Sequence, residues 1–123
     1  MEISFTDREL DVMGVLWDRG PSTVAEVRDA LPDNLAYTTV LTILRVLKDK
    51  SHVGTEEEGR AHRFRALVER HQAGVSAIRR LVRKIFQGSP EMLLTQLVSD
   101  EKLTDDDIRR MRELLDERLT SEE

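Results

Sequence analysis

Residues 37–66, YTTVLTILRVLKDKSHVGTEEEGRAHRFRA, decide the fold, because the hydrophobic period changes part-way along them. Over residues 37–50 the apolar side chains recur at helical spacing, which predicts a helix with a buried stripe of Val40, Ile43, Leu44 and Leu47. Residues 53–57 and 61–66 predict two short strands joined by a turn at residues 58–60. The stretch therefore predicts a helix followed by a β-hairpin.

Two shorter helices are predicted before this stretch. Each begins with a Thr that is followed three residues later by Glu, Thr6 with Glu9 and Thr23 with Glu26, which is the spacing of a capping box. Phe5 is expected to pack on Leu10, and Gly20-Pro21 ends the first helix. The side chains expected to face the core are Leu10, Val12, Met13, Leu16 and Trp17 in the first helix and Val24, Val27 and Leu31 in the second.

Three more helices are predicted from about Glu69 to the end of the sequence. The first carries an apolar seam at alternating three- and four-residue steps, and the last carries a second stripe. These helices hold too few apolar residues for a separate core, so the two stripes are expected to pair with a second copy of the chain. The predicted dimerisation residues are Val75, Ile78, Val82, Ile85, Ile108, Met111, Leu115 and Leu119.

The predicted order is three helices, a hairpin and three helices. This order indicates a mainly α fold with a small two- to three-stranded β wing. We expect a winged helix-turn-helix domain over residues 1–70 and a helical dimerisation domain over residues 71–123.

Composition narrows the possible functions. The 123 residues include no Cys, which excludes disulfides, thiolate catalysis and Cys-based metal sites. No apolar run is long enough to span a bilayer, and the polar, acidic start is unlike a signal peptide, so we expect a cytoplasmic protein without membrane insertion. The net charge is −5, but residues 37–72 carry seven basic and five acidic side chains and are the net-positive third of the chain.

The exposed face of the helix over residues 37–50 suits a DNA groove. A turn of 100° per residue places Thr38, Thr42 and Arg45 opposite the buried stripe, flanked by Thr39, Leu41 and Lys48. Thr can bond phosphates or base edges, Arg can grip guanine in two places, and Tyr37 could reach a phosphate. The alternative is an ordinary solvated face.

The hairpin adds Arg60 near its tip, with Arg63 and Arg65 beside it. A wing would lay these side chains along the phosphate backbone, whereas a solvent-exposed hairpin edge would carry them only to prevent edge pairing. The predicted DNA-binding residues of the wing are Arg60 and Arg63. The acidic run Glu56–Glu58 opposes DNA contact, so we expect these side chains to point away from the duplex or the wing to bind weakly.

Three stretches of the chain resemble the penicillinase-repressor family (the BlaI/MecI/CopY repressors). They are TDRELDVMGVLWDRGPSTVAEVRDAL at 6–31, LAYTTVLTILRVLKDK at 35–50 and EGRAHRF at 58–64. The resemblance implies a homodimeric, sequence-specific transcriptional repressor on a pseudo-palindromic dyad operator of double-stranded DNA. It implies a recognition helix over residues 37–50 in the major groove, and target genes for antibiotic resistance or metal handling.

The chain departs from this family pattern at several positions. In the best-known branch a membrane sensor-protease cuts an Asn-Phe bond in the dimerisation region, and Gln96-Leu97 stands at the aligned position here. The absence of Cys excludes copper sensing by thiolates. Ser51 and His52 stand where the family commonly has Gly and an apolar residue, and a Ser in a left-handed conformation would cost ~1 kcal/mol.

Other functions are weakly supported by the sequence. His52, His62 and His71 lack metal-site spacing, and His62 is expected on the inner face of the hairpin, so no metal or cofactor is predicted. No nucleophile motif, phosphate loop or paired-carboxylate setting indicates an enzyme. The main alternative is a dimeric helical protein-interaction module that binds a protein and no DNA. The acidic run favours it, and the arginines and the Thr-rich face oppose it.

Overall fold

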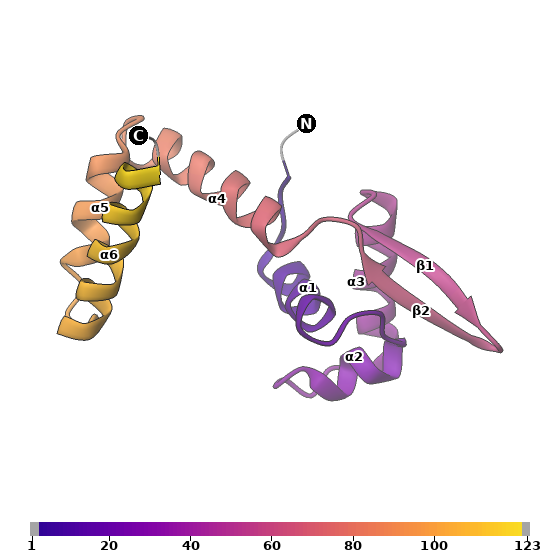
Figure 1. The fold of residues 1–123 in the computed structure, drawn as a ribbon. Helices are drawn as coiled ribbons and strands as arrows, with labels where there is room; N and C mark the ends of the chain where they lie inside the picture. The colour runs from indigo at the N-terminus through magenta and orange to yellow at the C-terminus, as the bar shows by residue number, and fades with distance from the viewer. Residues whose placement is uncertain (1–2, 122–123) are drawn as a thin grey trace. The chain divides into compact units, whose positions relative to one another are not determined.

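The computed structural model describes residues 3–121 apart from the side chain of Glu58. The element order confirms the predicted mainly α fold class with a hairpin wing, and the chain divides into two compact units, Met1–Ile78 and Arg79–Glu123 (Figure 1). The boundary falls within a helix, and each unit is described separately below. The elements are α1 (Asp7–Arg19), α2 (Val24–Ala30), α3 (Tyr37–Asp49), β1 (Val53–Glu58), β2 (Ala61–Ala66), α4 (Arg70–Lys84), α5 (Pro90–Val98) and α6 (Asp105–Ser121).

The predicted capping boxes are present at the starts of α1 and α2. The Thr6 hydroxyl accepts a hydrogen bond from the Glu9 backbone N–H at 3.1 Å, and the Glu9 carboxylate accepts one from the Thr6 N–H at 2.7 Å. Thr23 and Glu26 make the same pair of bonds at 3.2 and 3.0 Å. These local bonds satisfy N–H groups that a helix leaves free at its start, so both helices begin where the sequence predicts.

The first unit holds one hydrophobic core. It is formed by side chains from α1, α2, α3 and the hairpin, among them Val12, Met13, Leu16, Val27, Val40, Leu44, Leu47, Val53 and Phe64. The predicted stripes of α2 and α3 are buried or packed against this core.

The predicted core face of α1 was wrong at one position. Leu10 is 42% exposed, whereas Val15 and the carboxylate residue Glu9 are buried. Phe5 packs on the rings of Trp17 and His52, with centroid distances of 6.4 and 5.0 Å. The buried arc of α1 is therefore rotated towards Glu9.

The burial of Glu9 is explained by Lys50, which follows α3. The Lys50 ammonium donates to both Glu9 oxygens at 2.9 Å. Burial acts to raise the pKa of Glu9, but the bond from the Thr6 N–H and the Lys50 charge outweigh it and hold that pKa below its usual value. The pair therefore ties the start of α1 to the end of α3.

The hairpin is anchored to the helical core through β2. Its register pairs Val53 with Ala66 and Glu57 with His62, and the turn contains Gly59 at φ +64°. Phe64 exchanges two backbone hydrogen bonds with Ser22, at 2.8 and 3.0 Å, which adds a one-residue bridge to the two strands. The hairpin then projects beyond α1–α3 (Figure 1).

The end of α3 confirms the predicted left-handed residue. Ser51 has φ +65°, and its N–H donates to the Lys48 carbonyl while the N–H of His52 donates to the Leu47 carbonyl. This is a Schellman ending, whose left-handed position is usually taken by Gly.

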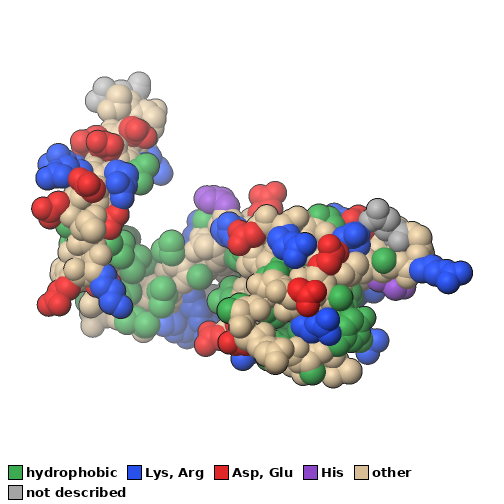
Figure 2. Space-filling model, turned by 90° about the horizontal axis from the view of Figure 1, so that it is seen from below, with side chains coloured by type: hydrophobic (Ala, Val, Ile, Leu, Met, Phe, Trp, Pro, Cys, Tyr) green, Lys and Arg blue, Asp and Glu red, His purple; other side chains and the backbone are tan. Residues whose placement is uncertain are grey.

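The second unit contains the end of α4 together with α5 and α6. Ser89 caps α5, and the predicted Thr104 cap opens α6 through bonds with Asp107. None of residues 79–121, the described part of this unit, is buried. Figure 2 shows hydrophobic side chains exposed among charged ones in the region of α5 and α6. None of the helices within residues 3–121 combines the length and apolar character needed to cross a bilayer.

Candidate nucleic-acid interface

The outward face of α3 carries the side chains that the sequence singles out. Thr38, Thr39, Thr42, Arg45 and Lys48 are all exposed, opposite the buried Val40, Leu44 and Leu47. The Thr42 hydroxyl donates to the Thr38 carbonyl at 2.9 Å, so its methyl group and its two oxygen lone pairs are what it offers to a ligand. Tyr37 begins the helix, is 45% exposed and lies 6.0 Å from the guanidinium of Arg28.

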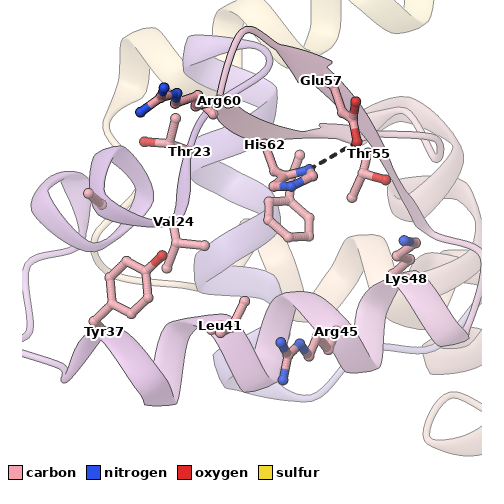
Figure 3. A pocket seen from close by; sticks show the side chains of 13 residues that line it. Thr23, Val24, Tyr37, Leu41, Arg45, Lys48, Thr55, Glu57, Arg60 and His62 are labelled. Atoms are coloured by element: carbon pink, nitrogen blue, oxygen red, sulfur yellow. Dashed lines mark ion pairs between the residues drawn. The ribbon is translucent and has the colours of Figure 1, made fainter.

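A groove of about 640 Å³ lies between α2, α3 and the hairpin. Figure 3 shows side chains of α3 along one side of it and those of the hairpin along the other, with residues of α2 at one end. Three basic residues, Arg45, Lys48 and Arg60, contribute to its lining. The full lining is Thr23, Val24, Ala25, Tyr37, Leu41, Arg45, Lys48, Thr55, Glu57, Arg60, Ala61, His62 and Phe64.

The structure separates the predicted residues into three groups. Tyr37, Arg45, Lys48 and Arg60 line the groove, and the three Thr residues lie on the exposed face of α3. Arg63 is directed elsewhere: its guanidinium lies 2.6 Å from the Glu26 carboxylate of α2. The cationic part of the candidate site therefore comes from α3 and the hairpin turn.

Glu57 is an acidic residue that also lines the groove. Its carboxylate lies 4.0 Å from Nδ1 of His62 (Figure 3), and the orientation of the acidic run relative to a DNA duplex stays a prediction. The signal was available in the alternation of β2: His62 shares a face with Phe64, and the short turn sets Glu57 opposite His62. Glu56, paired with Arg63, occupies the other face.

Comparison with known proteins assigns most of the chain to one family. A family model described as "Penicillinase repressor" matches residues 5–117, which includes both α3 and the hairpin. The chain belongs to the penicillinase repressor family. This confirms the resemblance seen in the sequence, and a family of repressors agrees with the expectation that the chain is not an enzyme.

Two relatives of this penicillinase repressor family member cover different shares of it. The transcriptional regulator BlaI of Mycobacterium tuberculosis (strain ATCC 25618 / H37Rv) is 46% identical over 61 residues, which are 47% of this chain and 44% of that protein. The match thus spans less than half of that relative. The methicillin resistance regulatory protein MecI of Staphylococcus aureus (strain N315) is 19% identical over 112 residues, covering 89% of this chain and 91% of MecI.

Solved structures support the winged-helix fold of this family member. A MarR family protein from Bacillus stearothermophilus matches with a TM-score of 0.54 and 15% identity, over 97% of this chain and 76% of that one. MepR, a transcription regulator of the Staphylococcus aureus multidrug efflux pump MepA, matches with a TM-score of 0.51 and 18% identity, over 98% and 82% of the two chains. At these identities the likeness shows the fold.

The predicted dimerisation residues of this penicillinase repressor family member are solvent-accessible in a single chain. Ile78, Ile85, Ile108, Leu115 and Leu119 are 52%, 62%, 39%, 51% and 68% exposed, and Val75, Val82 and Met111 are half-buried. The aligned cleavage position, Gln96-Leu97, lies within α5, and the Leu97 side chain is 46% exposed.

The three histidines are separately placed. His52 lies against Phe5, and the side chain of His62 is 63% exposed because it lies beyond the core on the hairpin face that it shares with Phe64. His62 therefore lies on the hairpin face that the sequence predicts, and its side chain is exposed there. Within residues 3–121, no three His, Cys, Asp or Glu side chains converge as metal ligands would.

Proposed function

We propose that this chain is a cytoplasmic, homodimeric, sequence-specific transcriptional repressor that binds a pseudo-palindromic operator in double-stranded DNA. The observation that carries the proposal is the groove, whose lining includes Arg45 and Lys48 of α3 and Arg60 of the hairpin turn. A local cationic surface of this kind binds the phosphate backbone even when the whole chain is acidic. Membership of the penicillinase repressor family supports the same function.

The side chains of α3 divide into two roles under this proposal. Arg45 binds guanine through two hydrogen bonds, and the methyl groups of Thr38 and Thr42 contact thymine methyl groups in the major groove. Thr39, Tyr37 and Lys48 bind phosphates and fix the register of the helix, as Arg60 does from the wing.

Dimerisation through the second unit completes the proposed site. Without a buried side chain of its own among residues 79–121, this unit leaves apolar stripes that a second copy can cover. A dimer of winged-helix domains would engage two half-sites about 34–36 Å apart, or a multiple of that distance.

We propose that repression ends by cleavage of the dimerisation unit near Gln96-Leu97, by a membrane sensor-protease. The nine-residue helix α5 holds both exposed residues and is short enough to open locally. A cut there would detach α6, and the second domain would lose its effective-concentration advantage of ~10²–10⁴ in affinity. Limited proteolysis followed by mass spectrometry tests this. A first cut in the hairpin, with residues 90–99 protected, or DNA release by a small molecule from an intact chain, would overturn it.

Substitutions in α3 and the hairpin test the DNA-binding proposal. A gel shift compares the promoter of its own operon with random DNA at two salt concentrations. Arg45→Ala is expected to cost about 1–3 kcal/mol on the promoter and little on random DNA. Arg60→Ala is expected to weaken both alike and to reduce the salt slope by about one. Arg109→Ala, whose guanidinium pairs with Asp106 on α6, is the control for loss of one positive charge.

A wild-type chain without a salt-dependent shift would contradict the proposal. It would favour the alternative, a dimeric module that binds a protein and no DNA, for which the carboxylate of Glu57 in the groove is the supporting observation. Equal losses on both DNAs for Arg45→Ala would instead reduce Arg45 to a phosphate contact.

A further inference from the structure

Arg63 faces the protein, although its position in the hairpin resembles that of a DNA-binding arginine. Strand alternation places it on the face opposite to His62 and Phe64, and those two residues line the groove. Its Nη1 lies 2.6 Å from Oε1 of Glu26 and donates to the Pro21 carbonyl at 3.4 Å. The Arg63 side chain is 29% exposed, in contrast to the exposed Arg60 at the turn.

The carboxylate that Arg63 binds is itself held in place. Glu26 closes the capping box of α2, so its Oε1 also accepts from the Thr23 backbone N–H at 3.0 Å. Its Oε2 lies 3.6 Å from Arg19, the last residue of α1. The Thr23 N–H and the Arg63 charge hold the pKa of Glu26 below its usual value, so this carboxylate is ionised at neutral pH.

This ion pair lies next to the backbone attachment of the hairpin. Phe64, the neighbour of Arg63, exchanges hydrogen bonds of 2.8 and 3.0 Å with Ser22. The backbone bridge and the buried side chains of Val53 and Phe64 hold the base of the hairpin on the core. The Arg63–Glu26 pair adds an attachment one residue nearer the turn, which helps to fix the angle at which the hairpin leaves the core. Arg60 lies three residues before Arg63, so its position depends on that angle.

We propose that Arg63 and Glu26 are positioning residues that set the orientation of the hairpin, through which Arg60 reaches the phosphate backbone. Arg63 acts through Arg60 and makes no DNA contact of its own. This inference rests on the proposed DNA-binding function and adds to it two residues outside the groove, one of them acidic.

Substitution of Glu26 gives the sharpest test. Loss of its negative charge would raise the DNA affinity, whereas loss of its positioning role would lower it. Glu26→Gln removes a negative charge, which by itself would tighten DNA binding, while Gln retains the capping-box bond. Positioning predicts that Glu26→Gln weakens binding by about three- to tenfold, that Arg63→Gln causes the same loss, and that the double variant loses no more than either. Arg63→Lys, which keeps the charge, is expected to restore part of the affinity.

The measurement is fluorescence anisotropy of a labelled duplex covering the promoter of its own operon, with the full chain. Asp29→Asn is the matched control, since Asp29 also lies on α2 but pairs with Arg28 and not with the hairpin. It is expected to bind as tightly as wild type or slightly tighter. In an Arg60→Ala background, Arg63→Gln is expected to cause no further loss. Circular dichroism melting checks that all variants are folded.

Several results would overturn the inference. Tighter binding by Glu26→Gln, to the extent seen for Asp29→Asn, would show that only charge matters. A further loss from Arg63→Gln in the Arg60→Ala background would assign Arg63 a DNA contact, and a loss proportional to a lower melting temperature would reduce the pair to a stabilising one. Absence of binding by the wild-type chain would overturn the proposed function and this inference together, whereas the other results leave the proposed function standing.

Discussion

At the scale of single residues, two adjacent glutamates of β1 differ in what they face. Glu57 lines the groove beside His62, and Glu56 lies on the opposite face, across from Arg63. A carboxylate in a phosphate-binding groove repels DNA, whereas one on the far face acts only through the net charge of the protein.

Glu57→Gln is therefore expected to tighten DNA binding by about three- to tenfold at low salt and by less at high salt, because the repulsion is screened. Glu56→Gln removes the same charge and is the matched control. Anisotropy titrations at two salt concentrations check the difference. Equal gains from both substitutions would contradict the idea that Glu57 faces bound DNA.

The sequence predicts the exposed face of α3 but not the pairing of Arg63 with Glu26, because only the first depends on a local pattern. The exposed face of α3 follows from helical period, and its residues are found outward as expected. The pairing of Arg63 with Glu26 joins residues 37 positions apart, and depends on how the hairpin docks on α2. A local pattern contains no information about such a contact.

At the scale of elements, the helix starts are predictable because their signals are local. The boxes at Thr6 and Thr23 and the caps at Ser89 and Thr104 each involve residues within one turn. The burial of Glu9 is not predictable in this way, because its partner Lys50 lies 41 residues further along the chain.

The end of α3 leads to a prediction about stability. Ser51 holds φ +65°, a conformation that costs a side chain about 1 kcal/mol and Gly very little. Ser51→Gly is therefore expected to raise the free energy of unfolding by up to about 1 kcal/mol, while Ser51→Val lowers it. Urea denaturation measures both. A destabilising Ser51→Gly would mean that the hydroxyl contributes more than the backbone strain costs.

The Glu9–Lys50 pair leads to a prediction about pH. Because the folded-state pKa of Glu9 lies below its usual 4.5, the ionised carboxylate stabilises the fold above that pH, and this contribution is lost as the pH falls through the folded-state value. Glu9→Gln is expected to cost about 1–3 kcal/mol at pH 7 and much less at acidic pH. Denaturation at pH 7 and at pH 3 measures the two values. A constant difference between wild type and variant would contradict the linkage.

At the scale of the whole molecule, the two units differ in how they are stabilised. The first has a core closed by α1–α3 and the hairpin, whereas residues 79–121 hold no buried side chain. The sequence predicts this difference from the number of apolar residues in each part. The compact units meet after Ile78, and the assignment of DNA binding to residues 1–70 and of dimerisation to residues 71–123 stays a prediction.

Ile78→Asp tests dimerisation. The Ile78 side chain is 52% exposed, and in the proposed interface a carboxylate there would be buried without a partner. The variant is expected to sediment as a monomer and to lose about 10²-fold or more in operator affinity. Ala77→Asp places the same charge at an exposed position off the stripe and is the control. A dimeric Ile78→Asp chain would show that the seam on α4 is not the interface.

The lack of buried side chains in α5 and α6 also has a consequence for gene dosage. If the second unit forms a core only when two chains pair, the active repressor is the dimer. While dimers are scarce, their concentration rises with the square of the chain concentration. A twofold fall in synthesis then removes about three-quarters of the active repressor, by mass action. Such a cell would respond steeply to a modest change in expression, with no inducer needed to sharpen the response.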